Sequence, residues 1–204
     1  MDYVYQLTLP CPSAQLVEKI TSLVSNIKFN NEGKQWLDEL NNISNTSSHS
    51  FFTDSEVDQM VEQEYGNYFQ RPIGAIIGVM SNSNSDTGCQ PPHVDSARAL
   101  GLNCYISLGG DNVKTTFYNH VGETKEVGST NIPYAEIQDQ KIGSIVFEKE
   151  KWYTFEACRL HSVENIKTTR TFLCIYIKGP TVSYKLEDLV NDYPMLLGNS
   201  LELT

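Results

Sequence analysis

Three residues have the types and the spacing needed to bind a metal ion: His93, Asp95 and His161. His93 and Asp95 are two positions apart, and residues i and i+2 of a β-strand point to the same face, about 7 Å apart along the backbone. Two histidines and one carboxylate on one side of a metal leave the opposite positions open, which suits oxygen chemistry at Fe(II). Taken singly, each of these residues is more often structural or exposed, so the hypothesis depends on all three together.

A fourth residue, Arg170, follows His161 by nine positions. The order His93-x-Asp95, His161 and Arg170 resembles the Fe(II)/2-oxoglutarate-dependent dioxygenases, and the motifs His-Val-Asp, Gly-Gly and Arg-Leu-His-Ser-Val resemble the prolyl-hydroxylase-like branch of that superfamily. The resemblance covers residues 73–179. It implies that His93, Asp95 and His161 bind Fe(II), and that Arg170 binds the far carboxylate of 2-oxoglutarate.

The resemblance also implies an activity. O2 would be the second cosubstrate and ascorbate an optional cofactor. 2-Oxoglutarate would be decarboxylated to succinate and CO2 while a C–H bond of the substrate is hydroxylated, most simply that of a prolyl residue in a peptide or protein. A free amino acid or small metabolite and an alkylated nucleobase are the alternative substrates within this class.

Arg170 lies in a predicted strand that should be buried on both faces, where an unpaired charge is costly. A guanidinium fork binds a carboxylate through two hydrogen bonds, so a bound dicarboxylate would satisfy it. An ion pair with a structural acid, such as Glu148 or Glu156, is the other explanation. The resembled family often has Ser or Thr two or four positions after the arginine, whereas this chain has Phe172 and Cys174.

A hydroxyl that assists the cosubstrate must therefore come from elsewhere. Tyr105 is the preferred candidate; it shares one face of an alternating strand with Asn103 and Ser107. The other candidates are Ser107, Thr169 and Thr171. Candidates for the pocket wall, for which core packing is an equally good interpretation, are Arg98, Phe117, Tyr118 and Trp152. The remaining histidines, His49 and His120, are interpreted as loop or turn residues.

Composition favours one globular domain spanning residues 1–204. Lys and Arg total 15 against 25 acidic residues, and a net charge of −10 opposes non-specific binding to nucleic acid or anionic membrane. The five cysteines include no CxxC spacing, and no secretory leader or membrane-length apolar run occurs, so a cytoplasmic protein is expected. The expected partner is a peptide or a small molecule.

From residue 73 onward, seven or eight short strands alternate with turn signals, which is typical of a sandwich or barrel. Together with the resemblance, this predicts a mainly β protein with flanking helices and a double-stranded β-helix (jelly roll, cupin-like) core. We expect an N-terminal strand and supporting helices in 1–72, the β core in 73–179, and a C-terminal helix and tail in 180–204.

Within the flanking regions, residues 2–9 predict an edge strand. Apolar residues at helical spacing after Ser13 predict a first helix, and Thr53 or Asp54 begins a second one. The polar stretch 41–50 predicts a mobile loop.

Two other classes of function stay open. A cupin-type binding protein without oxygen chemistry could use the same fold. A structural β-sandwich of the virion type would leave His93 and Asp95 as surface residues.

Overall fold

The computed structural model describes residues 4–29, 35–36, 41–45, 49–81, 90–93, 100–119, 141–178 and 184–204. For 28–29, 35–36, 41–45, 49–50 and 90–93 it describes the backbone alone. Of the residues discussed above, Asp95, Arg98 and His120 lie outside the described ranges.

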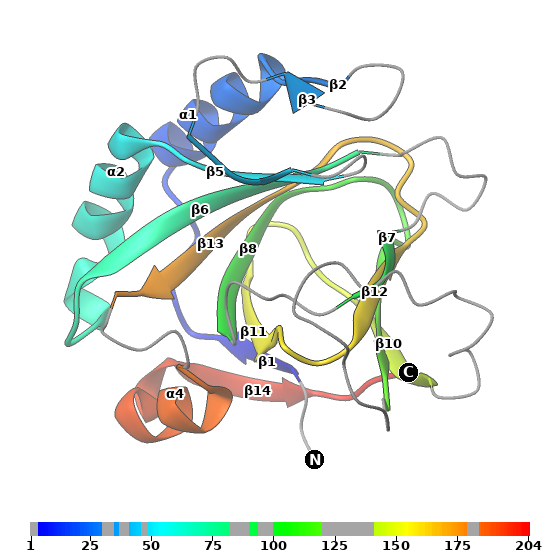
Figure 1. Ribbon diagram of the computed structural model, residues 1–204. Helices are drawn as coiled ribbons and strands as arrows, with labels where there is room; N and C mark the ends of the chain where they lie inside the picture. Colours follow the sequence, from blue (N-terminus) through cyan, green and yellow to red (C-terminus); the bar gives the residue numbers. More distant parts are fainter. Residues whose placement is uncertain are drawn as a thin grey trace.

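Two antiparallel sheets face each other and form the body of the molecule (Figure 1). Four strands at the centre of the large sheet are β6 (Ile73–Met80), β8 (Leu100–Leu108), β11 (Trp152–Glu156) and β13 (Arg170–Ile177), in the order β11-β8-β13-β6. The small sheet contains β7 (Gln90–His93), β9 (Lys114–Tyr118), β10 (Lys141–Val146) and β12 (His161–Glu164), in the order β10-β9-β12-β7. Most strands that follow one another along the chain thus lie in opposite sheets, whereas β9 and β10 pair with each other in the small sheet; this order is that of a jelly roll. The predicted fold class is confirmed.

Further strands extend the large sheet on both sides. On one side lie β1 (Val4–Leu7) and β14 (Leu197–Leu201), and on the other lie β5 (His49–Thr53) and β4 (Asn41–Asn45). Two expectations were therefore wrong: β1 pairs with both β11 and β14 instead of lying at the edge, and 41–50 contains two strands. A small ribbon joins β2 (Lys28–Phe29) to β3 (Gln35–Trp36).

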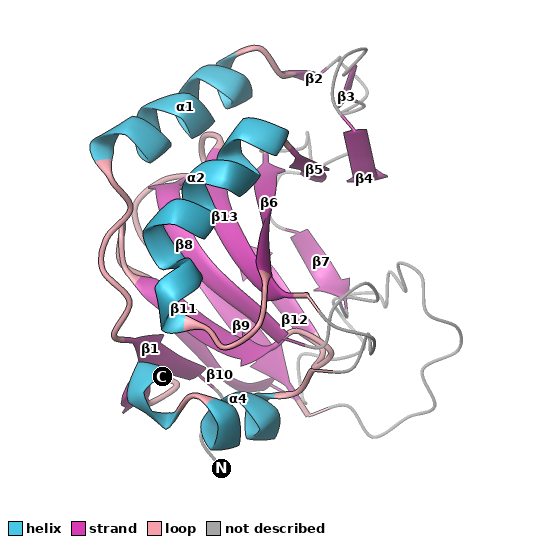
Figure 2. Cartoon of the chain, turned by 90° about the vertical axis from the view of Figure 1, so that its left-hand side faces the viewer, coloured by secondary structure: helices cyan, strands magenta, loops and turns pink. Residues whose placement is uncertain are grey.

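The described helices pack on one side of the sheets, as Figure 2 shows for α1 (Ala14–Ser25), α2 (Ser55–Tyr65) and α4 (Leu186–Asp192). The caps agree with the sequence: the Ser13 hydroxyl accepts a hydrogen bond from the Leu16 amide, and the Asp54 carboxylate accepts from the amides that follow it. Short 3-10 helices η1 (Gly66–Tyr68) and η3 (Pro194–Leu196) follow α2 and α4. In the described ranges, no helix combines the length and the apolar character needed to cross a bilayer.

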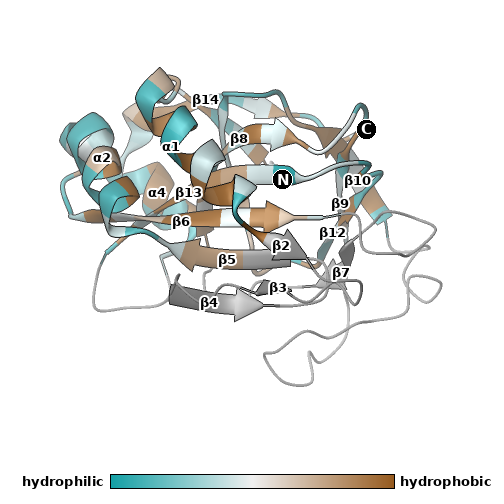
Figure 3. Ribbon diagram, turned by 90° about the horizontal axis from the view of Figure 1, so that it is seen from above, coloured by the Kyte–Doolittle hydropathy of each residue, from teal (hydrophilic) through white to brown (hydrophobic). Residues whose placement is uncertain are grey.

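Two clusters of buried side chains lie on opposite faces of the large sheet. The outer core packs α1 and α2 against the sheet and includes Leu16, Val61 and Leu173. The inner core lies between the two sheets and includes Tyr105, Phe117, Phe147, Phe155 and Phe172. Side chains alternate between the two cores along each strand. In Figure 3 the helices have hydrophilic as well as hydrophobic stretches, whereas β6 and β8 are largely hydrophobic.

Candidate active site

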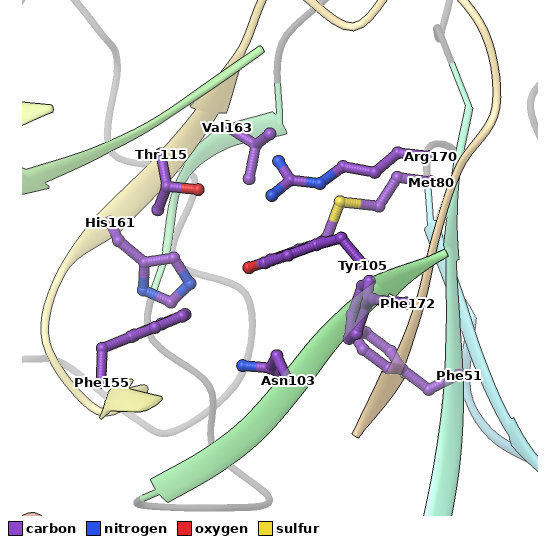
Figure 4. A pocket seen from close by; sticks show the side chains of 10 residues that line it. All are labelled: Phe51, Met80, Asn103, Tyr105, Thr115, Phe155, His161, Val163, Arg170 and Phe172. Carbon is purple, nitrogen blue, oxygen red and sulfur yellow. The ribbon is translucent and has the colours of Figure 1, made fainter. Parts of the chain in front are cut away.

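A hollow lies between the two sheets, beside the inner core, and is lined by side chains from both (Figure 4). It includes about 360 Å³ of space free of atoms, part of which is open solvent. The lining residues are Phe51, Met80, Asn103, Tyr105, Thr115, Phe155, His161, Val163, Arg170 and Phe172. Three of the residues singled out from the sequence, Tyr105, His161 and Arg170, are thus brought together.

His161 begins β12 and is 4% exposed. Its Nδ1 lies 2.8 Å from the carbonyl oxygen of Arg159. Because a carbonyl oxygen can only accept, Nδ1 carries a proton; in the neutral ring Nε2 then has the lone pair, which is the tautomer needed to bind a metal through Nε2. The ring packs edge-to-face on Phe155, with the centroids 5.5 Å apart. Both contacts fix the orientation of the imidazole.

The other two predicted metal ligands are less fully described. The backbone of His93 lies at the end of β7, and its Cα is the register partner of the Cα of His161 on β12. Asp95 lies outside the described residues. The described side chains alone contain no group of three metal-binding residues, so the complete triad stays a prediction.

Arg170 begins β13, between Met80 of β6 and Leu108 of β8, and it is 2% exposed. Its Nε and Nη1 atoms are buried and have no hydrogen-bond partner in the described part of the chain. The guanidinium carbon lies 4.4 Å from the centre of the Tyr105 ring, a cation–π contact. Burial lowers the pKa of the Arg170 guanidinium, and Tyr105 partly opposes this effect. Arginine nevertheless stays charged in proteins, so the site holds a buried cation.

The two acids considered as structural partners of Arg170 pair with other residues. Glu148 lies 2.7 Å from the Lys151 ammonium, and Glu156 lies 2.6 Å from Nε of Arg159. The explanation of Arg170 by an ion pair with either acid is therefore wrong. Its charge is left facing the hollow with a tyrosine ring as its polar neighbour.

Tyr105 is the hydroxyl candidate that lines the hollow. Its ring stacks on Phe147 with centroids 4.7 Å apart, and its hydroxyl points toward His161 (Figure 4). The Ser107 hydroxyl instead donates to the Thr169 carbonyl at 2.9 Å. Neither Thr169 nor Thr171 is among the lining residues.

The residues proposed for the pocket wall have mostly structural roles. Trp152 belongs to the outer core, where its indole N–H donates to the Pro10 carbonyl at 2.8 Å, so of its two interpretations core packing is confirmed. The Tyr118 hydroxyl is 2.9 Å from the Ser162 hydroxyl. Phe117 lies beside His161, with ring centroids 6.2 Å apart, and is not among the lining residues.

Asn103 and Thr115 are polar lining residues that were not among the candidates from the sequence, and Asn103 is the one with an atom unpaired within the described ranges. It is 2% exposed, and its Oδ1 is buried with no hydrogen-bond partner among the described residues. The signal was present, because an amide at Asn103 interrupts a largely apolar strand on the face that carries Tyr105. The apolar lining residues Phe51, Met80 and Phe155 gave no such signal.

Comparisons with known proteins identify no family. No protein-family model matches the chain, and no curated protein matches its sequence. Solved structures that resemble it include AviO1 from Streptomyces viridochromogenes Tue57, with a TM-score of 0.48 and 11% identity over 90% of this chain and 93% of that one. They also include the non-heme alpha-ketoglutarate-dependent epimerase SnoN from nogalamycin biosynthesis, with a TM-score of 0.47 and 12% identity over 99% of this chain and 89% of that one. Similarity at this level says nothing about the chemistry of this chain.

Proposed function

We propose that the chain is an Fe(II)- and 2-oxoglutarate-dependent oxygenase that hydroxylates a C–H bond in the hollow between the sheets. The observation that carries this proposal is Arg170, a buried guanidinium at the hollow with two donor nitrogens that have no partner among the described residues. A buried charge without a counter-ion is costly, and a carboxylate accepts two parallel hydrogen bonds from a guanidinium. The far carboxylate of 2-oxoglutarate is the partner that satisfies this site.

His93, Asp95 and His161 are the proposed iron ligands. Residues opposite each other in an antiparallel pair project to the same face, so the paired positions of His93 and His161 are compatible with one shared ion. The tautomer of His161 offers Nε2 to that ion. When bound, the iron would supply the activation of O2, coupled to decarboxylation of 2-oxoglutarate to succinate and CO2.

The protein's own contribution would be to bind, orient and exclude water. Arg170 would hold the cosubstrate by its far carboxylate, and the Tyr105 hydroxyl would add a second polar contact. Phe155 and Phe172 line the same hollow and would keep bulk water from the reacting groups. The proposed substrate is a prolyl residue in a peptide or protein, and this finer assignment rests on the motif resemblance alone.

Anaerobic titration calorimetry with Fe(II) and 2-oxoglutarate tests the proposal. Native protein should bind 2-oxoglutarate, and Arg170→Met should weaken that binding by roughly a hundredfold, because charge-assisted hydrogen bonds are lost. The control Arg71→Met removes a cation that is 48% exposed and should leave the affinity unchanged. Absence of 2-oxoglutarate binding by the native protein would overturn the proposal.

Turnover is tested separately by succinate release in air. Asp95→Ala and His161→Ala should each abolish it; unchanged turnover would remove the altered residue from the metal site. A screen of proline-containing peptides and small metabolites for a mass gain of one oxygen would then decide the substrate class. Oxygenation of metabolites alone would exclude the prolyl assignment.

A further inference from the structure

Asn103 has a polar side chain that is buried beside the hollow. Its backbone belongs to β8, where it pairs with Cys174 of β13 and with Tyr153 of β11. Its side-chain amide makes no such contribution, because Oδ1 is buried without a partner in the described residues. Buried amide groups in folded proteins are nearly always hydrogen-bonded, and an unpaired one is less favourable than an apolar side chain of similar shape.

The position of Asn103 relates it to the proposed cosubstrate site. Asn103 and Tyr105 lie on one face of β8, whereas Arg170 is paired with Leu108, near the other end of that strand. Figure 4 shows Arg170 and Asn103 at opposite ends of the hollow, with the Tyr105 hydroxyl and the His161 ring between them. A ligand that extends from Arg170 past His161 would therefore meet Asn103 at its second end.

We infer that Asn103 is a further binding residue, whose side-chain amide donates a hydrogen bond to the 2-oxo-acid end of the cosubstrate. This inference rests on the proposed function. The oxygen and nitrogen of the amide exchange places by a half-turn, so Nδ2 can face either the hollow or the strand. Figure 4 shows the amide nitrogen pointing into the hollow, where a carboxylate or keto oxygen of the ligand would accept its hydrogen bond.

Two ligands of different length separate the roles of Asn103 and Arg170. 2-Oxobutyrate has the 2-oxo-acid end of 2-oxoglutarate but no far carboxylate. Anaerobic calorimetry with Fe(II) should find that Asn103→Leu weakens both ligands by the same factor, about tenfold or more, because a hydrogen bond to an anionic oxygen is lost. Arg170→Met should weaken 2-oxoglutarate and leave 2-oxobutyrate unchanged. Asn103→Asp should weaken both ligands further than Asn103→Leu, because the new carboxylate repels the anion.

Stability of the ligand-free protein provides the second readout. Asn103→Leu should leave the thermal midpoint unchanged or raise it, since an unpaired amide is replaced by an apolar group. Thr154→Val is the matched control: the Thr154 hydroxyl is also buried and unpaired among the described residues, but Thr154 does not line the hollow. This control should behave like Asn103→Leu in stability and like native protein in ligand affinity.

Three outcomes would overturn the inference. Native affinity for both ligands in Asn103→Leu would mean that the amide does not contact them. Weakened binding of 2-oxoglutarate alone would place the contact at the Arg170 end. A lowered midpoint with unchanged affinities would make Asn103 structural. In each of these cases native protein still binds 2-oxoglutarate, so the proposed function stands; failure of native protein to bind either acid would remove both proposals.

Discussion

The inner and outer cores lie on the two faces of one sheet, yet they differ in whether their buried polar atoms are hydrogen-bonded. In the outer core, the hydroxyl of Tyr65 and the indole N–H of Trp152 both donate to the Pro10 carbonyl. Beside the inner core, Asn103 and Arg170 supply three of the four unpaired buried side-chain atoms in the described ranges; the fourth, the Thr154 hydroxyl, does not line the hollow. The outer face is thus arranged for stability, and the inner face keeps binding capacity that a ligand can use.

Strand β13 alone shows this difference between the two faces of the sheet. Leu173 is fully buried in the outer core, whereas Arg170 and Phe172 line the hollow. Substitutions on the outer side should change stability, and those on the inner side should change ligand binding.

Leu173→Ala should have the largest effect on stability. Leu173 is 0% exposed on a central strand, and truncating such a leucine costs about 2–5 kcal/mol in the free energy of unfolding. Urea unfolding followed by circular dichroism measures this cost. A loss below about 1 kcal/mol would mean that the outer core is loosely packed at this point.

Gly78→Ala should affect both properties. A Cβ on Gly78 would lie 2.1 Å from the ring carbon Cζ of Phe172, so the ring must move from the wall of the hollow. We expect a loss of about 1–3 kcal/mol in unfolding free energy, typical of overpacking, together with weaker binding of 2-oxoglutarate. Gly66→Ala is the control, because its Cβ would meet only the flexible Glu62 side chain. Equal effects of the two substitutions would contradict the role assigned to Phe172.

Tyr105→Phe should have a smaller and more selective effect. The ring keeps its stacking on Phe147 and its contact with Arg170, so unfolding should change little. Loss of the hydroxyl should weaken 2-oxoglutarate binding about fivefold, the usual size for one hydrogen bond. Calorimetry on the folded variant measures it, and unaltered affinity would remove Tyr105 from the cosubstrate site.

The smallest expected effect concerns the rate at which the cysteine thiols are labelled. Cys11 and Cys158 are exposed, whereas Cys104 is buried in the outer core and Cys174 in the inner core. Burial raises the pKa of Cys104, and burial with the Glu156 charge raises that of Cys158. Since the thiolate is the reactive form, Cys158 labelling should keep rising with pH above the range of an ordinary thiol.

The reactivity of the two buried cysteines also allows the inner and outer cores to be compared. Peptide mass spectrometry should find Cys104 and Cys174 unmodified in the native protein. If one of them reacts first under mild denaturant, Cys174 should do so, since the hollow admits solvent beside the inner core. Earlier reaction of Cys104 would reverse the comparison.

The fold was largely predictable because the central strands have clear alternation or continuous apolar runs. Ile73–Met80 and Arg170–Ile177 are buried on both faces and were recognised as strands. The polar strand Asn41–Asn45 and the polar beginning of His49–Thr53 were missed, since they become strands through the pairing of β5 with β6 and of β4 with β5. Leu197–Leu201 was missed for the same reason.

The site was predictable only in part. Arg170 and Tyr105 could be selected because a cation and a hydroxyl in apolar strands need an explanation. For Trp152 the sequence left the pocket wall and the core equally open, because every residue from Trp152 to Phe155 is buried and alternation cannot then show which residues face the hollow. Asn103 was passed over because an amide in a strand can usually pair with its neighbours, and the absence of such a pair is visible only in three dimensions.

The end of the described chain joins the two sheets. β14 pairs with β1 in the large sheet, and Thr204 then exchanges two backbone hydrogen bonds with Ser144 of β10 in the small sheet (Figure 1). This segment therefore connects the large sheet to the small sheet. Substitutions in this segment should therefore change the spacing of the two sheets without altering any residue that lines the hollow.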